Sequence, residues 1–379
     1  MAKIALFLSL FAVVYHYALY PLLVIVLSRY RPRLVHVANP TLWPKVTFLI
    51  AAYNEERVIA DKLRNTLELD YPGPLEIVVV SDGSSDRTPE IVTEFGYRGV
   101  ISRHQPERRG KTAALNRGVA QASGEIIVFS DANNEFSKDA LRELVKHFGD
   151  PAVGGVCGAK RIKSAEDRES SLGDGLYWLY ESAIKFAEGR IGSITNADGE
   201  IFAIRQSLYR PMNERTINDD TQITFDIVSQ GYRVLYEPAA HSSEYASISI
   251  ADDFHVKVRM VAGGFQSLFI NWRLFLPPRS WFAWAFLSHK LLRWLAPGFL
   301  IVLFLASLWI NDGPYRRLLL AQLLFYGVAF YGYLRIRRGP LPLLVYVPFY
   351  FSAMNLAALF GLFRFIAGRQ STQWRKAQR

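Results

Sequence analysis

The stretch VTFLIAAYNEE, residues 46–56, decides the fold class of this 379-residue chain. Its first six residues are apolar or β-branched, as in a buried strand, and the small residues Ala51 and Ala52 lead into a polar corner at Asn54. In open α/β sheets such corners follow the carboxyl ends of parallel strands, and ligands bind there. We therefore predict an α/β fold and expect binding residues directly after each strand.

Short apolar runs alternate with amphipathic stretches from residue 45 to 240, which predicts one domain with a mainly parallel sheet. The predicted strands are 46–51, 75–81, 99–102, 125–130 and 152–158. The predicted helices between them are 56–69, 88–95, 112–122 and 138–148.

Apolar segments flank this domain. Residues 1–30 contain about 25 mostly apolar positions, more than the roughly 20 that a helix needs to cross a bilayer. Arginines rather than a small-residue cleavage site follow, which favours a retained transmembrane helix over a cleaved signal peptide. After the domain we predict amphipathic interface helices at 250–290, a C-terminal transmembrane region at 291–368 and a basic tail at 369–379.

The net charge of +10 is carried by the flanks. Four basic residues precede position 45, ten follow position 313, and neither flank contains an acid, so the part between them carries −4. This distribution argues against nucleic acid as a partner, because the domain itself is mildly acidic. It also follows the positive-inside rule, which predicts that the domain lies in the cytoplasm beside the inner membrane. Three C-terminal crossings would put the C-terminus outside, whereas the basic tail indicates inside, so the topology of that end stays open. Cys157 is the only cysteine, which excludes a disulfide framework and a cysteine-based zinc site.

Four polar elements follow the predicted strands or open the next helix. They are AAYNEE at 51–56, SDGSSDRT at 81–88, RRGKTAALN at 108–116 and FSDAN at 129–133. Each carboxylate turn taken alone is as compatible with a helix cap as with a ligand site. The glycine and basic residues of the third element suit a phosphate at a helix N-terminus, although a solvated basic loop has the same composition.

As an ordered set, these elements resemble the nucleotide-binding half of glycosyltransferase family 2, whose members have the GT-A fold. The resemblance implies a nucleotide-sugar donor, with UDP as the expected nucleotide. Ala52 would then belong to a corner whose small side chains let the donor approach the backbone closely. Asn54, Glu55 and Asp82 would face the nucleoside, and Lys111 would bind the phosphates.

The fourth element stands where the family has an Asp-x-Asp that holds a divalent cation against the donor diphosphate. The resemblance therefore implies Mg²⁺ or Mn²⁺ as cofactor, with Asp131 as the stronger ligand. Asn133 stands in the second position and offers only a neutral amide oxygen. The alternative role for Asp131 is a helix cap.

The acceptor half of the resemblance begins at residues 177–181, YWLYE, and continues to 196–200, NADGE. In polysaccharide-type members of the family, a loop with glycine borders the acceptor at the second place. The resemblance therefore assigns Asp198 and Gly199 to the acceptor. Trp178 is assigned there too, with core packing as its favoured alternative.

The element TINDDT, residues 216–221, supplies the carboxylate that an inverting transfer needs near the acceptor hydroxyl. Asp220 matches the final aspartate of the family's Thr-Glu-Asp or Gly-Asp-Asp element and is the predicted general base. Asp219 would support it, because adjacent carboxylates repel and raise proton affinity. The alternative is a pair of acids at a helix N-terminus.

The resemblance covers residues 45–266 and extends loosely to the membrane synthases of cellulose, hyaluronan and poly-N-acetylglucosamine. Those processive enzymes carry Gln-x-x-Arg-Trp on an interface helix, whereas this chain has VKVRM at 256–260. Arg259 is retained and is expected to meet the donor diphosphate, but the glutamine and the stacking tryptophan are absent. The tail residues 373–375, QWR, either close over the site or anchor at the interface.

We therefore expect an inverting, metal-dependent hexosyltransferase at the cytoplasmic face of the inner membrane. It would move a sugar to a saccharide or polyprenyl-linked acceptor in polysaccharide biosynthesis, with the bilayer and polysaccharide export proteins as partners. Two alternatives remain open. One is a transferase that adds a single sugar to a polyprenyl-linked oligosaccharide, and the other is a scaffold subunit that binds nucleotide without catalysis.

Overall fold

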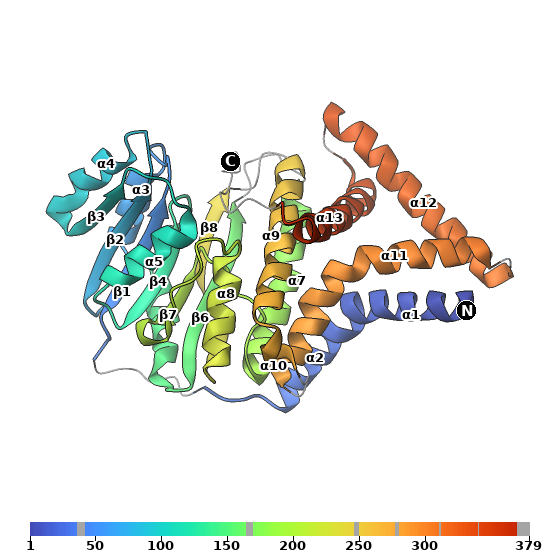
Figure 1. Cartoon of the computed structure of the whole chain (residues 1–379), viewed down its shortest axis with the longest axis horizontal. Coiled ribbons are helices and arrows are strands. Elements are labelled where there is room, and N and C mark those ends of the chain that lie inside the picture. The colour runs from blue at the N-terminus through green and yellow to red at the C-terminus, as the bar shows by residue number, and fades with distance from the viewer. Residues whose placement is uncertain are drawn as a thin grey trace.

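The computed structural model describes residues 1–35, 42–163, 170–245, 250–276, 280–310, 312–339 and 341–369. An α/β domain occupies one end of the molecule, and a group of long helices extends from it (Figure 1). Residues 373–375, to which the sequence assigns a possible closing segment, lie outside the described residues, as does the predicted basic tail after Arg369.

In the described part of the chain the sheet has eight strands in the order β3-β2-β1-β4-β7-β6-β8-β5. Its first half is parallel and consists of β1 Val46–Ala52, β2 Leu75–Asp82, β3 Val100–Gln105 and β4 Ile126–Asp131. The second half is mixed and consists of β5 Glu135–Phe136, β6 Val153–Lys163, β7 Phe202–Arg205 and β8 Arg233–Tyr245. Strand β7 is antiparallel to both β4 and β6, so the predicted parallel arrangement stops at β4 and resumes only between β6 and β8.

Helices cover both faces of the sheet, which is why all seven positions of β1 are buried. Phe48 and Leu63 share one core with helices α3 Ile59–Leu67, α4 Thr88–Glu94 and α6 Ala140–Val145. Leu49 and Leu115 belong to the other core, beneath α5 Lys111–Gln121 and α8 Asp219–Ser229. Consecutive residues of β1, such as Phe48 and Leu49, therefore pack into cores on opposite faces of the sheet.

The remaining helices join the domain to an apolar region. They are α1 Ala2–Val14, α2 Tyr20–Tyr30, α7 Ser170–Ile191, α9 Ile250–Ile270, α10 Trp281–Phe286, α11 Leu292–Trp309, α12 Gly313–Arg335 and α13 Leu343–Ile366. Short π-helical segments, η1 Tyr15–Leu19 and η6 Leu287–Leu291, connect α1 to α2 and α10 to α11. Short 3-10 segments are η2 Phe95–Arg98, η3 Lys146–Gly149, η4 Gln206–Leu208, η5 Trp272–Phe275 and η7 Ile336–Arg338.

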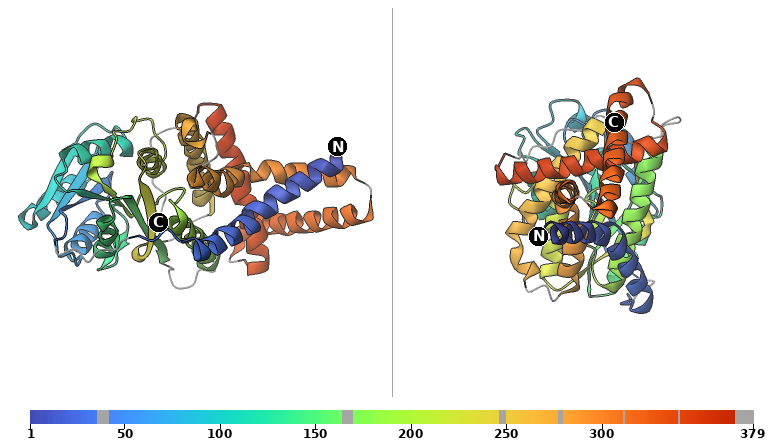
Figure 2. Two further views of the ribbon diagram at one scale, coloured as in Figure 1. Left: turned by 90° about the horizontal axis from the view of Figure 1, so that it is seen from below. Right: turned by 90° about the vertical axis from the view of Figure 1, so that its right-hand side faces the viewer.

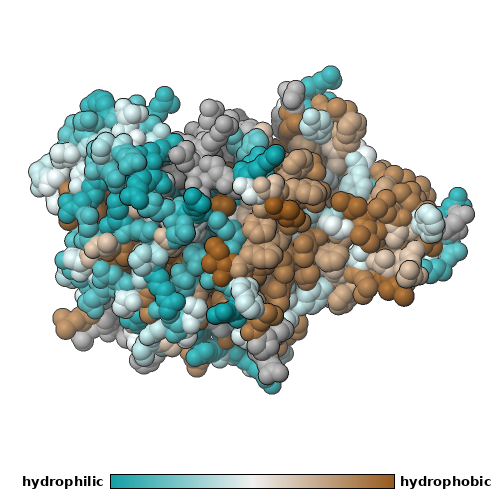
Figure 3. Space-filling model, in the orientation of Figure 1, coloured by the Kyte–Doolittle hydropathy of each residue, from teal (hydrophilic) through white to brown (hydrophobic). Residues whose placement is uncertain are grey.

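Four helices among the described residues are long and apolar enough to cross a membrane. They are Ala2–Tyr30, Trp281–Trp309, Gly313–Arg335 and Leu343–Ile366. The second of them begins at Trp281 rather than at the predicted position 291, because α10, η6 and α11 form one continuous helix. Figure 3 shows the hydrophobic surface gathered over this end of the molecule, whereas the α/β end is mostly hydrophilic.

The apolar helices do not all run in the same direction. Helices α1 and α11 lie side by side and extend away from the sheet, whereas α13 runs across them beside α9 (Figures 1 and 2). Lys3 Nζ lies 2.8 Å from Asp312 Oδ2, so the N-terminus sits beside the turn between α11 and α12. The N-terminus and this turn are at the end of the molecule far from the sheet (Figure 2).

Helix α8 is held between the sheet and the membrane-side helices. The ring of Phe225, on α8, lies 5.4 Å from the ring of Phe275 and 5.2 Å from that of Phe286, with both pairs edge to face. Such aromatic pairs add to the stabilisation that burial provides. The helix that carries Asp219 and Asp220 is therefore packed against the segment that begins the second apolar helix.

Candidate active site

The candidate site lies at the carboxyl edge of the parallel half of the sheet. Strand β1 pairs with β2 on one side and with β4 on the other, so Ala52 lies opposite Ser81 and Ala51 opposite Asp131. Because of this register, the residues that follow the three strands meet at one edge. The predicted donor residues Asn54 and Asp82 are thus brought to the same edge as Asp131.

Hydrogen bonds join the first two strand-end loops. The Ser85 backbone N–H donates to Asn54 Oδ1 at 2.8 Å, and the Asn54 N–H donates to Ser84 Oγ at 3.1 Å. Asn54 has a φ of 52°, a left-handed conformation that asparagine tolerates better than most residues. The N–H of Glu55, a buried residue, donates to Thr88 Oγ1 at 2.8 Å. Asn54 and Glu55 therefore fix the position of the loop after β1 relative to the loop after β2.

Asp82 organises the basic loop that follows β3. Its carboxylate is 2% exposed and accepts the N–H of Gly110 at 2.6 Å, the N–H of Arg109 at 3.1 Å, and Arg117 Nη2 at 2.9 Å. Gly110 has a φ of 101°, which favours glycine at this position. Asp82 thus fixes the loop that leads into the N-terminus of α5 by hydrogen bonds. Contact of Asp82 with a nucleoside stays a prediction.

Lys111 joins the donor edge to the predicted catalytic pair. Its Nζ lies 2.8 Å from Asp131 Oδ1 and 3.6 Å from Asp219 Oδ2. Burial alone would lower the pKa of Lys111, but the carboxylates of Asp131 and Asp219 raise it above its ordinary value. The lysine is therefore a fixed positive charge between two acids, and its contact with a donor diphosphate stays a prediction.

Asp219 and Asp220 open α8, where the helix dipole favours carboxylates. Burial, and next the neighbouring carboxylate of Asp219, raise the pKa of Asp220 to about 6, although Lys111 and the Thr221 N–H oppose this shift. Asp220 Oδ1 accepts that Thr221 N–H at 2.6 Å. A carboxyl group with such a pKa changes protonation close to neutral pH, as a general base must.

The loop with Asp198 and Gly199 lies directly against this pair. A Cβ added to Gly199 would lie 3.4 Å from Asp219 Oδ2, 3.4 Å from Asp220 Cβ and 3.7 Å from Lys111 Nζ. The structure therefore brings together five of the predicted site residues that lie far apart in the sequence: Lys111, Asp131, Gly199, Asp219 and Asp220.

Asp198 is fixed by a lysine that the sequence analysis does not identify. Lys185 Nζ, on α7, lies 2.7 Å from Asp198 Oδ2, with side-chain exposures of 2% and 16%. The Asp198 N–H also donates to Cys157 Sγ at 3.1 Å, and burial raises the pKa of that thiol. A lysine in the middle of an otherwise mostly apolar helical stretch was the available signal for Lys185.

Among the described residues, Lys160 connects Trp178 to the loop at residues 196–200, which is the predicted acceptor loop. Its ring lies 5.4 Å from Lys160 Nζ, and Lys160 Nζ lies 2.8 Å from Glu200 Oε2. Glu200 follows Gly199 in the chain. The structure thus places Trp178 one lysine away from the loop, and a direct role in acceptor binding stays a prediction.

Asn134 joins the turn after β4 to the acceptor loop and is also absent from the sequence analysis. It accepts Lys62 Nζ at 2.8 Å and donates through Nδ2 to the Glu200 carbonyl at 2.8 Å. Burial lowers the pKa of Lys62 to about 7. The hydrogen bonds of Asn134 to Lys62 and Glu200 therefore fix the turn that carries Asp131 and Asn133.

The oxygens near Asp131 suit a divalent cation that is shared with a diphosphate. The described residues contain no group of three His, Cys, Asp or Glu side chains arranged to hold a metal by themselves. Mg²⁺ commonly uses one or two carboxylates together with substrate phosphates. The carboxylate of Asp131 and the amide of Asn133 fit that pattern, with the side chain of Asp131 37% exposed.

Helix α9 reaches the loop that precedes the catalytic pair. Asn218 Nδ2 donates to the Met260 carbonyl at 2.8 Å, and a Cβ added to Gly263 would lie 2.4 Å from Asn218 Oδ1. Arg259 precedes Met260 and so lies on the turn of α9 that touches this loop. Its contact with the donor diphosphate stays a prediction.

Comparison with known proteins agrees with this geometry. Residues 47–211 match the model of Glycosyl transferase family 2. A β-monoglucosyldiacylglycerol synthase from Synechocystis sp. is 30% identical over 75% of this chain and 61% of its own length. A poly-β-1,6-N-acetyl-D-glucosamine synthase from Staphylococcus aureus is 29% identical over 59% of this chain and 55% of its own length. The chain thus spans about three fifths, or slightly less, of these relatives.

A solved structure shares the whole architecture. A mannosyltransferase from Pyrobaculum calidifontis, in complex with GDP-mannose and Mn²⁺, superimposes with a TM-score of 0.72 at 24% identity, covering 97% of this chain and 100% of that one. This likeness shows the fold. The chain therefore contains a glycosyltransferase family 2 domain of the GT-A fold, joined to helices long and apolar enough to cross a membrane.

Proposed function

We propose that this protein is an inverting glycosyltransferase that moves a sugar from a nucleotide-sugar, with UDP as the expected nucleotide, to a saccharide or lipid-linked acceptor at the membrane surface. One observation carries the proposal. Asp220 is a partly buried carboxylate with a raised pKa, and it lies against the Gly199 loop and beside the Lys111–Asp131 ion pair.

In the proposed reaction Asp220 takes the proton of the acceptor hydroxyl. The hydroxyl oxygen bonds to the anomeric carbon of the donor sugar from the face opposite the diphosphate. The bond from that carbon to the diphosphate oxygen breaks, its electrons stay with the nucleoside diphosphate, and the sugar's anomeric configuration inverts. The charge of Asp219 raises the pKa of Asp220, and Lys185 holds Asp198 in place by an ion pair.

The chain's own charges prepare the site for the leaving diphosphate. Lys111 would exchange part of its contact with Asp131 for a phosphate oxygen. Asp131 and Asn133 would hold Mg²⁺ or Mn²⁺, which supplies charge neutralisation for the diphosphate when it is bound. Mn²⁺ and GDP-mannose in the Pyrobaculum mannosyltransferase support this class of donor and cofactor.

The relatives support both kinds of acceptor. The staphylococcal relative is named as the synthase of a polysaccharide and the Synechocystis relative as the synthase of a glycolipid. We place the α/β domain on the cytoplasmic side of the inner membrane because basic residues flank the apolar helices on its side. Polysaccharide export proteins would be partners only if the product is a polymer.

Purified protein tests the assignment of the base. Asp220→Asn should lower sugar transfer by about 10²-fold or more, because general-base catalysis contributes about 10² to 10⁴. Asp226→Asn, on the same helix and away from the Gly199 loop, is the matched control. Full transfer by Asp220→Asn would refute the role of Asp220. The donor and the cation are identified with a panel of UDP- and GDP-sugars, scored for nucleotide release with and without EDTA.

A transferase that adds one sugar is the second candidate, favoured by the replacement of the processive enzymes' Gln and Trp with Val256 and Met260 beside Arg259. The length of radiolabelled product distinguishes one addition from a polymer. A scaffold subunit would release no nucleotide from any donor in the presence of Mn²⁺.

A further inference from the structure

One face of the second apolar helix is charged at its domain end and lines a cavity beyond it. Lys290, Arg293, Pro297, Leu300 and Phe304 follow one another at spacings of three, four, three and four residues. Residues at these spacings lie on the same side of a helix. This face is therefore amphipathic along its length, with cations at one end and hydrocarbon at the other.

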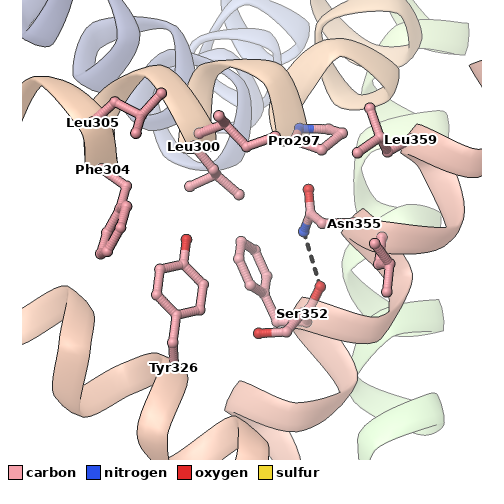
Figure 4. Close-up of a pocket in the computed structure, with 11 residues that line it drawn as sticks. Pro297, Leu300, Phe304, Leu305, Tyr326, Ser352, Asn355 and Leu359 are labelled. Atoms are coloured by element: carbon pink, nitrogen blue, oxygen red, sulfur yellow. Dashed lines mark hydrogen bonds between the residues drawn. The ribbon is translucent and has the colours of Figure 1, made fainter.

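The apolar part of this face lines a cavity between α11, α12 and α13 (Figure 4). The cavity has a volume of about 280 Å³ and is lined mainly by hydrocarbon side chains, with three polar ones: Tyr326, Ser352 and Asn355. Figure 4 shows the Tyr326 hydroxyl and the Asn355 amide directed into this space. Ser352 Oγ is buried without a hydrogen-bond partner among the described residues. We call this space the lipid groove.

The charged end of the face belongs to a cluster of three cations and two carboxylates. Lys290, Arg293, Glu181 and Glu188 are buried, and His289 lies between the two carboxylates. Lys257 is partly buried and interacts with Arg293, Glu181 and Lys290 electrostatically. Glu181 accepts Arg293 Nη1 at 2.7 Å and also pairs with Lys290. Burial, and next the charge of Arg293, lower the pKa of Lys257 to about 8. The cluster therefore carries a net positive charge that an added anion would stabilise.

The cluster lies between the lipid groove and the candidate catalytic pair. On the groove side, Arg293 Nε donates to His16 Nε2 at 3.1 Å, and Asn355 Nδ2 lies 3.5 Å from the hydroxyl of Tyr17, the next residue after His16. On the domain side, Glu181 is one helical turn, about 5–6 Å, from Lys185. Lys185 in turn holds Asp198, whose neighbour Gly199 touches Asp219 and Asp220.

We propose that the acceptor is a long-chain lipid phosphate that carries a sugar, with its chain in the lipid groove and its phosphate at the Lys257–Lys290–Arg293 cluster. The sugar would then extend past Lys185 toward Asp220, which takes the proton of its hydroxyl. The inference rests on the proposed function and names the acceptor class for the same site. The phosphate binds and is not the attacking group.

A pair of photoreactive probes tests the site in the full-length protein, held in phosphatidylcholine nanodiscs. One probe is a long-chain alkyl phosphate with a diazirine in the chain, and the other is the alcohol of the same chain. After irradiation, mass spectrometry should place the phosphate probe on peptides of α11 and α13. The alcohol should label them about tenfold less, as expected when one charge-assisted hydrogen bond is lost.

Leu300→Trp fills the groove and should abolish labelling by the phosphate probe. Leu308→Trp, on the same helix at an exposed position that does not line the groove, is the control and should keep it. Lys257→Met should lower labelling about tenfold through the lost cation. Thermal unfolding of Leu300→Trp and Lys257→Met in detergent, compared with Leu308→Trp and the unaltered protein, separates loss of the lipid from loss of folding.

Equal labelling by phosphate and alcohol, labelling outside the groove, or competition by phosphatidylglycerol as strong as by unlabelled alkyl phosphate would overturn the inference. Undiminished labelling of Leu300→Trp would overturn it too. Failure of the proposed function looks different, because a protein without donor turnover would still label in the groove.

Discussion

The ion pair between Lys185 and Asp198 is predicted to support the acceptor loop, and Lys185→Met tests it. The two side chains are 2% and 16% exposed, and their charged atoms are 2.7 Å apart. Burial by itself would lower the pKa of Lys185, but Asp198 raises it above its ordinary value, so the pair is ionic. Methionine keeps the approximate length of the side chain and leaves the partly buried carboxylate of Asp198 without its cation.

Breaking a buried ion pair at one partner costs about 3–5 kcal/mol. We expect the lower end, about 3 kcal/mol, because the partly exposed Asp198 can regain some hydration. One kcal/mol shifts the melting temperature of a domain of 150–250 residues by about 2–4 °C, so the expected decrease is about 6–12 °C. Thermal unfolding of purified protein in detergent measures it, with Lys138→Met, at an exposed lysine of the same domain, as control.

The double variant Lys185→Met with Asp198→Asn should recover most of this loss, because the amide leaves no buried charge. The coupling energy in the double-mutant cycle should exceed about 1 kcal/mol. A decrease below 2 °C in Lys185→Met, or no recovery in the double variant, would refute the idea that this pair holds the loop.

Three further predictions concern the base, the basic loop and the membrane. Since the raised pKa of Asp220 is about 6 and the base must be unprotonated, transfer should fall about tenfold per pH unit below 6, and the residual activity of Asp220→Asn should lack this decline. Gly110→Ala should cost about 1–3 kcal/mol in thermal unfolding because of its φ of 101°, whereas Gly96→Ala, in open space, should be neutral. Gly313→Cys, at the turn far from the α/β domain, should react with a membrane-impermeant maleimide on intact cells, and Gly96→Cys, in the domain, only after permeabilisation. Cys157 is buried and adds little background labelling. The reverse labelling pattern would contradict the proposed orientation.

The parallel half of the domain was predictable because its signals are local. Each strand is a short apolar run that ends at a polar corner, and the position of β1 between β2 and β4 then brings Asn54, Asp82 and Asp131 to one edge. The mixed half was not predictable. Strand β7 is only four residues long, which is too short to show a period, and its antiparallel pairing depends on β4 and β6 far away in the sequence.

Side chains that position the site were missed for the same reason. Arg117 stands in a stretch that is typical of an amphipathic helix, and Lys185 interrupts a mostly apolar one. Their partners, Asp82 and Asp198, are identified only in the folded structure. Lys111 was assigned to phosphate from its glycine-containing loop. Its two ion pairs, with Asp131 and Asp219, depend on the tertiary structure.

Helix α9 contacts both the loop that precedes the predicted catalytic pair and the membrane-side helices. On one side its Met260 carbonyl accepts Asn218, and on the other Gly361 of α13 packs so closely that a Cβ there would lie 2.7 Å from Val261 Cβ. Two close contacts therefore connect α13, through α9, to the residue that precedes Asp219, and we expect a change in the tilt of α13 to reach it. If α13 adjusts its tilt to the hydrocarbon thickness around it, the chain length of the surrounding lipids becomes a variable that sets the rate of the enzyme.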